Sequence, residues 1–276
     1  PGIVIEAYGE YRLFEGKTRI YDYHVLSPLE VQQRVFDAGI VGLGGAGFPS
    51  AVKLTPGLNL DIELLILNAA ECEPWISCDE SLLRHHVHDV ITGFEILAHG
   101  LQADECVIAI EDNKTEAIAL LEQALPEHDG LEIKLKKISS LYPAGGEKQL
   151  IKSITGMDIP ADGLPVDIGV VCYNVGTAMA VKKAVLDEEP LISRIVTVTG
   201  PAINQARNLE VLIGTPLQDI IEQCGGYTDN FDYLIMGGPM MGFRLHSDQV
   251  PLIKTTNCLL AMESRVVEKE SPCIRC

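Results

Sequence analysis

The sequence predicts an α/β fold built on a mostly parallel sheet, followed by a smaller unit rich in strands. Between residues 63 and 186, short apolar runs alternate with amphipathic stretches, which is typical of a parallel sheet with helices on its faces. Polar or glycine-rich segments fall where these strands meet helices, and open α/β sheets bind ligands there. From Arg194 onward the pattern changes to strand, turn, strand and a short helix, which indicates a second domain.

Length, charge and cysteine usage restrict the possible functions. The 276 residues suffice for about two domains, and a formal charge of −18 argues against a nucleic-acid partner, which needs a basic surface. No apolar run approaches the ~20 residues that span a bilayer, so we expect no direct membrane span. The N-terminal residues do not resemble a signal peptide. The eight cysteines are scattered, as expected of free thiols rather than a disulfide framework.

The first 26 residues are interpreted as a connector. Pro1–Ala7 alternates like a strand, but no strand precedes it to pair with, so we expect the chain to start inside a larger protein. Pro28–Ala38 is then predicted to be a helix, with Ser27 as the N-cap and Gly39 just beyond its end.

A glycine-rich loop follows this helix and leads to Lys53. Glycine lets a backbone approach a ligand closely and present successive amides to an anion. A short helix beginning near Pro49 or Ser50 would bring the Lys53 ammonium to the same anion. The pattern matches neither the P-loop, because Val52 precedes the lysine, nor the dinucleotide fingerprint, whose glycines follow a strand. Since a glycine-rich turn is often only a turn, phosphate binding is a hypothesis, which rests on Gly42, Gly44, Gly45, Gly47 and Lys53.

The apolar run Glu63–Leu67 is predicted to be a buried strand, and polar residues follow its end. The Asn68 amide could pair with a heterocycle edge, and the Glu71 and Glu73 carboxylates could accept from ribose or ribityl hydroxyls. The alternative is a solvated acidic loop that caps the next helix. Cys72 and Cys78 lie in this region without a second pair of cysteines nearby, which favours free thiols over a metal site.

Asp79–Ala98 is predicted to be one long amphipathic helix. Its three histidines, His85, His86 and His88, lack the i, i+4 spacing of a metal pair and favour a solvated face. A strand over Glu105–Glu111, a helix over 114–124 and a more exposed strand over 131–138 continue the alternation.

A second glycine-rich turn, at residues 142–148, leads into a predicted helix over 149–154. It presents backbone amides and a carboxylate at the helix start. A strand over 167–172 is followed by Asn174 and Thr177 and then by a helix over 178–186. Helix capping by these two polar residues is the alternative to ligand binding. Because four such segments lie at strand–helix junctions, the sequence favours one shared cleft.

The remaining residues suggest strands from Arg194 onward and over 233–236, with a short helix after Thr215. Met240 and Met241 are expected in the core or at an interface. The chain ends in a CxxC formed by Cys273 and Cys276, and a lone CxxC is ambiguous among zinc, redox and iron–sulfur roles.

Seven motifs, in order, resemble the C subunit of the Rnf electron-transport complex: GLGGAGFPSAVK, NAAECEPWISCDE, YPAGGEKQL, YNVGTAMAV, GGPMMGF, KTTNC and PCIRC. More distantly, the core is similar to the FMN-binding, NADH-oxidising subunit of respiratory complex I. The resemblance implies a Rossmann-like FMN-binding domain of the complex I flavin-subunit type, then a small β-grasp (soluble-ligand-binding) domain, truncated at both ends. It divides the chain into a connector from a removed domain (1–26), an FMN- and NADH-binding α/β domain (27–190), a β-grasp domain (191–250) and a linker into a removed iron–sulfur domain (251–276).

The resemblance also implies roles for individual residues. The FMN phosphate region would be held by Gly42, Gly44, Gly45, Gly47 and Lys53. The ring and ribityl side would be lined by Asn68, Glu71 and Glu73, and the pocket completed by Gly146, Glu147, Asn174 and Thr177. NADH would be met by Phe48, Glu73 and Lys148, although Phe48 could instead plug the core beneath the loop. The metal ligands would be Cys273 and Cys276, an incomplete iron–sulfur motif that we expect to be empty in this chain.

Two positions depart from the complex I pattern. Ala70 stands where that family carries an acidic residue, and Lys148 stands where a second glutamate follows the one that matches Glu147. Lys148 could neutralise flavin or nucleotide charge and so change nucleotide affinity or preference.

The function implied by the resemblance is electron entry. Hydride would pass between NAD(H) and FMN, and single electrons between FMN and two 4Fe-4S clusters of the full-length protein, with no proton-transfer residue assigned. Its partners would be other Rnf subunits, at the cytoplasmic face of the bacterial inner membrane, with ferredoxin reached through another subunit and ion transport driven by the electrons. Two alternatives remain: a soluble cobalamin reductase of similar fold, and a flavin-free scaffold like the related subunit of the sodium-pumping quinone reductase.

Overall fold

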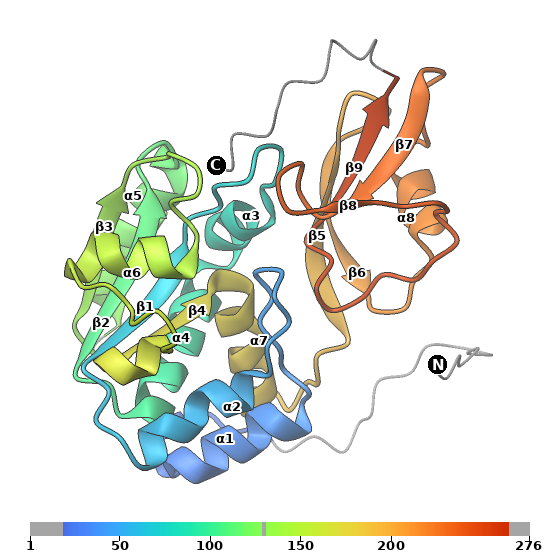
Figure 1. Ribbon diagram of the computed structural model, residues 1–276. Helices are drawn as coiled ribbons and strands as arrows, with labels where there is room; N and C mark the ends of the chain where they lie inside the picture. Colours follow the sequence, from blue (N-terminus) through green and yellow to red (C-terminus); the bar gives the residue numbers. More distant parts are fainter. Residues whose placement is uncertain (1–18, 129–130, 265–276) are drawn as a thin grey trace.

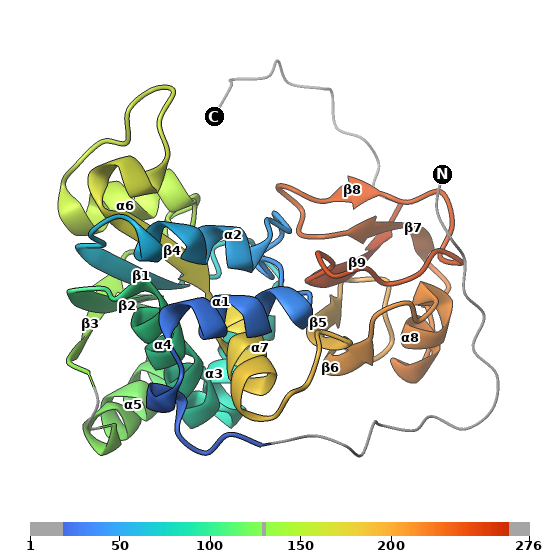
Figure 2. The ribbon, with the colours of Figure 1, turned by 90° about the horizontal axis from the view of Figure 1, so that it is seen from below.

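The computed structural model describes residues 19–128 and 131–264 (Figure 1). The predicted strand Pro1–Ala7 and the two cysteines Cys273 and Cys276 lie outside the described residues. Within them the chain forms two units side by side (Figure 2), the first ending with helix α7 and the second beginning with strand β5.

The first unit is built on a four-stranded sheet in the order β3-β2-β1-β4, with every neighbouring pair parallel. The strands are β1 (Leu64–Ala69), β2 (Glu105–Glu111), β3 (Ile133–Ile138) and β4 (Val170–Asn174). Successive strands move outward from β1 to β3, and β4 then lies on the other side of β1. The strand order therefore reverses between β1 and β4, which is where open α/β sheets form a ligand crevice.

Helices cover both faces of this sheet (Figure 2). One face packs against α1 (Pro28–Asp37), α4 (Val87–Leu101), α5 (Thr115–Ala124) and α7 (Val175–Leu186), and the other against α6 (Glu147–Thr155). Within β1, Leu65 and Leu67 enter the larger core and Ile66 enters the core beneath α6. This alternation is what a strand buried on both faces requires.

The start of the first unit follows the predicted signals. Ser27 caps α1 in a capping box, since the Glu30 amide donates to Ser27 Oγ at 3.3 Å and the Ser27 amide donates to Glu30 Oε2 at 2.8 Å. Gly39, at φ +65°, follows the helix end. The predicted short helix after the glycine loop is α2 (Ser50–Leu54). Short 3₁₀ turns occupy Tyr23–Val25, Thr55–Leu58, Leu125–Glu127 and Pro165–Ile168.

The predicted long helix over 79–98 is wrong in one respect, because it is two helices. His86 separates α3 (Cys78–His85) from α4, because its φ of −138° and ψ of 34° lie outside the helical region. The helical periodicity of apolar residues continues across this break, so the sequence pattern did not reveal it. The three histidines lie on a solvated surface, as expected.

The strand predicted over 167–172 begins later, because the 3₁₀ turn Pro165–Ile168 and Gly169, at φ +68°, precede it. Helices α6 and α7 begin earlier than the predicted starts at Gln149 and Ala178. The result is that Glu147 and Asn174 lie at or beside helix starts, next to the carboxyl ends of the strands.

The second unit is a five-stranded mixed sheet in the order β6-β5-β9-β7-β8, with one helix packed on it (Figure 1). Its elements are β5 (Ser193–Thr199), β6 (Arg207–Leu212), α8 (Leu217–Gln223), β7 (Phe231–Met236), β8 (Phe243–Arg244) and β9 (Cys258–Glu263). Because β9 is the central strand, residues 258–263 belong to this sheet and not to a linker beginning at residue 251.

Strand β9 also shows how the two units meet. Leu259 and Ala261 face the core beneath α8, whereas Cys258 and Leu260 pack with Ile76 and Cys78 of the first unit. The second sheet thus buries one face internally and part of the other against the start of α3. Across the described residues, no helix combines the length and the apolar character needed to cross a bilayer.

Candidate functional site

A cleft of about 710 Å³ opens at the carboxyl ends of β1 and β4, where the strand order reverses. Its volume lies within the roughly 300–1,000 Å³ of small-molecule sites. The second unit supplies one wall, including Gly238, Met241 and Phe243. Of the predicted site residues, the cleft is lined by Gly44, Gly45, Asn68, Glu71, Glu73, Gly146 and Asn174.

The glycine loop is closed by two backbone hydrogen bonds within it. The Gly42 amide donates to the Phe48 carbonyl at 2.8 Å, and the Gly47 amide donates to the Gly42 carbonyl at 3.1 Å. Between these bonds, the amides of Gly44, Gly45 and Ala46 donate to no group within residues 19–128 and 131–264. Gly45 has φ +111°, and a Cβ placed there would meet nothing within 4 Å. Consecutive unpaired amides beside open space form a cradle suited to an anion.

One residue of this loop, Leu43, is fixed on both sides by buried side chains. The Leu43 amide donates to Thr177 Oγ1 at 2.9 Å, and the Leu43 carbonyl accepts from Arg194 Nη2 at 3.0 Å. Thr177 therefore neither caps α7 nor lines the cleft, and the cap is Asn174, whose Oδ1 accepts from the Gly176 amide at 2.8 Å. Sequence reasoning missed Arg194, because nothing in its sequence neighbourhood distinguishes a buried arginine from an exposed one.

Two asparagines on neighbouring strands form the floor of the cleft and connect it to the segments around it. Asn68 and Asn174 are opposite each other in the β1–β4 register. Asn68 donates to the Gly145 carbonyl at 2.8 Å, and Asn174 donates to Asp79 Oδ2 at 2.5 Å. These bonds tie the second glycine turn to β1 and the start of α3 to β4.

Glu71 lines the cleft and also caps α3, although it lies before that helix in the sequence. Its carboxylate accepts from the Asp79 amide at 2.9 Å and the Glu80 amide at 3.3 Å, and it lies 3.8 Å from Lys114 Nζ. The expected alternative of a helix cap is therefore correct for this residue. Burial, reinforced by the Asp79 carboxylate, raises the pKa of Glu71 to about 7. The Glu71, Cys78 and Asp79 ligand atoms lie within 4.8 Å of one another, but protein donors already hold Glu71, and we assign no metal there.

Glu73 joins the two units. It accepts from the amides of Met240 and Met241, each at 3.0 Å, so the GGPMMG loop of the second unit wraps this carboxylate. The loop passes close to this carboxylate at Gly238, where an added Cβ would displace the Glu73 side chain. Met241 is 78% exposed and lines the cleft, so of the two expected locations, a core or an interface, the core is excluded and the interface stays a prediction.

The structure does not place Lys53 and Glu147 along the cleft. Lys53 Nζ instead lies 2.6 Å from Glu147 Oε1 and donates to the Cys172 carbonyl at 2.9 Å. Phe48 is 48% exposed, so it does not plug the core, and Lys148 is also exposed. Among the predicted residues, those that do not line the cleft are Gly42, Gly47, Phe48, Lys53, Glu147, Lys148 and Thr177. The six cysteines within the described ranges are free thiols, as expected.

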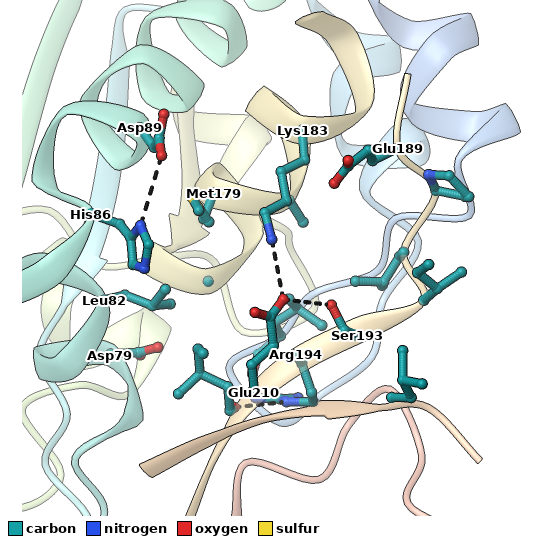
Figure 3. Close-up of a pocket in the computed structure, with 18 residues that line it drawn as sticks. Asp79, Leu82, His86, Asp89, Met179, Lys183, Glu189, Ser193, Arg194 and Glu210 are labelled. Atoms are coloured by element: carbon teal, nitrogen blue, oxygen red, sulfur yellow. Dashed lines mark hydrogen bonds and ion pairs between the residues drawn. The ribbon is translucent and has the colours of Figure 1, made fainter. Parts of the chain in front are cut away.

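A second cavity, of about 480 Å³, lies between α3, α4, α7 and strands β5 and β6 (Figure 3). Its charged groups pair with one another: Glu210 Oε1 lies 3.2 Å from Lys183 Nζ and accepts from Ser193 Oγ at 2.8 Å. None of the predicted site residues lines it. Leu43 and Asp79 line both cavities, so the glycine loop and the start of α3 separate them.

Comparisons with known proteins agree with this geometry. Residues 35–183 match the model of the Nuo51 FMN-binding domain, and residues 195–244 match that of the SLBB domain. The chain is 47% identical over 258 residues to the C subunit of the ion-translocating oxidoreductase complex of Yersinia pseudotuberculosis (strain YPIII), covering 92% of this chain and 36% of that protein. The corresponding C subunits of Serratia proteamaculans and Vibrio cholerae are 47% and 46% identical, with 99% and 92% of this chain and 39% and 33% of those proteins covered.

The chain thus spans between 33% and 41% of the length of the curated relatives it matches. Among solved structures, the NAD+-reducing [NiFe]-hydrogenase in its H2-reduced state shares the fold, with a TM-score of 0.74 and 23% identity over 87% of this chain and 47% of that chain. The same enzyme in its air-oxidized state gives a TM-score of 0.75 at 24% identity, with the same coverage.

Proposed function

We propose that this chain, which belongs to the family of the Nuo51 FMN-binding domain and is a homologue of the C subunit of ion-translocating oxidoreductase complexes, binds FMN in the 710 Å³ cleft. The observation that carries the proposal is the cradle formed by the amides of Gly44, Gly45 and Ala46, which donate to no group in the part of the chain that the structure describes. It opens into the cleft where the strand order reverses, and a phosphate needs such donors. When bound, FMN would supply hydride transfer and one-electron transfer, which side chains cannot perform.

The roles proposed for the residues follow from their positions. The loop amides take the FMN phosphate, and Gly42 and Gly47 close the turn that presents them. Asn68, Gly146 and Asn174 form the floor and side of the cleft, and the Glu71 and Glu73 carboxylates face it from the end of β1. Thr177 supports the loop from behind through Leu43.

Lys53 and Glu147 are proposed to act as a pair at the edge of the site. Their ion pair at 2.6 Å links α2 to the start of α6, beside the strand end at Cys172. Because the lysine is neutralised by the glutamate, the proposed role of the pair is to fix α2 against the start of α6 and so to shape the edge of the site, without direct contact to the ligand. NAD(H) is proposed as the electron partner, with Phe48, Glu73 and Lys148 as its contacts.

For the longer protein, the proposal is that electrons continue from FMN to two 4Fe-4S clusters, with Cys273 and Cys276 as the first ligands. Partner subunits of an Rnf-type complex, and ferredoxin through another subunit, would complete the path at the cytoplasmic face of the bacterial inner membrane. The names of the relatives support the place in an ion-translocating complex, because they describe the C subunit of an ion-translocating oxidoreductase complex.

Titration of the full chain with FMN, followed by quenching of flavin fluorescence, tests the proposal. We expect binding that is at least tenfold tighter than that of riboflavin, which lacks the phosphate, and bleaching of the bound flavin by NADH without oxygen. Gly45→Ala, at φ +111°, should lower FMN affinity at least tenfold by straining the cradle. Gly214→Ala is the matched control, because Gly214 has φ +98° and open space but lies away from the cleft. A protein that takes up no flavin would contradict the proposal and favour a flavin-free scaffold.

A further inference from the structure

We propose that Arg194, on strand β5 of the second unit, is a positioning residue for the phosphate cradle of the glycine loop. This inference rests on the proposed function, and it makes the second unit part of the flavin site. The residue lines the second cavity, as do Ser193 and Glu210 (Figure 3), and it reaches Leu43, which lines both cavities.

The geometry of one peptide plane connects Arg194 to the cleft. The Leu43 carbonyl, which accepts from Arg194 Nη2 at 3.0 Å, belongs to the same planar unit as the Gly44 amide. In a trans peptide the C=O and N–H bonds point in opposite directions. Holding the oxygen toward Arg194 therefore directs the Gly44 N–H away from Arg194, and Gly44 is one of the residues that line the cleft.

The charge of Arg194 also acts through this peptide. A cation that donates to the carbonyl polarises the amide and strengthens its N–H as a donor on the other side. Arg194 is only 6% exposed, so little water screens this effect. Burial lowers the pKa of Arg194, while the neighbouring Cys78 and Asp79 raise it, and an arginine remains charged in such surroundings.

Two more residues of the second unit, Lys254 and Thr255, lie against the glycine-rich segment of the first unit. Arg194 Nη1 donates to the Lys254 carbonyl at 2.5 Å, and Lys254 Nζ donates to the Gly39 carbonyl at 2.6 Å. A Cβ on Gly47 would lie 2.6 Å from Thr255 Cγ2, so the loop passes directly against this segment. The cradle is therefore held between Thr177 of the first unit and the Arg194–Lys254 pair of the second.

The test compares two ligands that differ only in the phosphate. We expect Arg194→Met and Arg194→Lys to weaken FMN binding at least tenfold while riboflavin affinity stays within twofold, because the defect is confined to the cradle. The lysine variant keeps a charge but loses the two-pronged donor, so it should fall between wild type and Arg194→Met. If thermal unfolding shows that Arg194→Met does not fold, the FMN and riboflavin affinities of Arg194→Lys, compared with those of the wild type, are the test.

Asn208→Ala is the matched control, because the Asn208 side chain also joins the two units, at Ser77, and its hydrogen bonds within the described residues go to Ser77 and Thr197 and not to the loop. It should leave both affinities unchanged. Equal losses of FMN and riboflavin affinity in the Arg194 variants, or no loss of FMN affinity, would overturn the inference while leaving flavin binding intact. A wild-type chain that binds neither ligand would instead overturn the proposed function, and the inference with it.

Discussion

Replacing Glu71 by glutamine should flatten the pH dependence of stability. Burial, together with Asp79, raises the pKa of Glu71 from 4.5 to about 7. Between these two values the folded protein keeps a proton that the unfolded chain has released, so the free energy of unfolding falls as pH rises. The pKa values differ by about 2.5, which corresponds to a loss of at most about 3 kcal/mol across this range. A glutamine cannot ionise and avoids this loss.

Guanidinium unfolding at pH 5, 6, 7 and 8, followed by the fluorescence of Trp75, the chain's one tryptophan, measures this effect. From pH 5 to pH 8, we expect the free energy of unfolding of the wild type to fall by about 1–3 kcal/mol relative to that of Glu71→Gln. Glu116→Gln, which removes a carboxylate whose side chain is 60% exposed, should keep the wild-type slope. Parallel curves for wild type and Glu71→Gln would refute the reasoning.

Four further substitutions test the contacts around the site and the packing behind it. Gly238→Ala should push the Glu73 carboxylate off the GGPMMG loop and lower the free energy of unfolding by about 1–3 kcal/mol, and an unchanged denaturation midpoint would contradict this contact. Lys53→Met and Glu147→Gln should lower FMN affinity by similar small factors because the residues act as a pair, whereas a tenfold loss confined to the lysine variant would indicate direct phosphate contact. Gly93→Ala should destabilise by about 1–3 kcal/mol in thermal unfolding, because its Cβ would collide with the α7 backbone, and wild-type stability would mean that the helices can separate.

Local signals predicted an α/β unit with a parallel sheet and a second, strand-rich unit, and the resemblance implied their types. Both are confirmed: a Nuo51 FMN-binding domain with a parallel sheet is followed by an SLBB domain. The Ser27 cap and the strand Glu105–Glu111 lie where the sequence predicted them. The cleft was also foreseeable, because polar residues at the carboxyl ends of parallel strands must meet at one edge. Asn68 and Asn174 do so in register.

The contacts that organise the site could not be predicted, because they join distant parts of the chain. Lys53 and Glu147 are 94 residues apart, and Arg194 and Leu43 are 151 apart. Each pair depends on how separate elements pack, and a single sequence carries no spacing rule for that. The apolar run of β9 was assigned to a linker for the same reason, since its partners β5 and β7 precede it by many residues.

The proposed phosphate site is compatible with a formal charge of −18 because the acidic side chains around the cleft are already bound. Glu71 accepts from two amides of α3 and faces Lys114, and Glu73 accepts from two amides of the second unit. These donors offset the negative charge locally, whereas the loop amides remain available within the described residues. Amide dipoles act over a few ångströms in a partly buried cleft, where the effective dielectric is low, but the net charge acts over longer distances that salt screens. The arrangement of donors, and not the overall charge, therefore decides which ligand the cleft can hold.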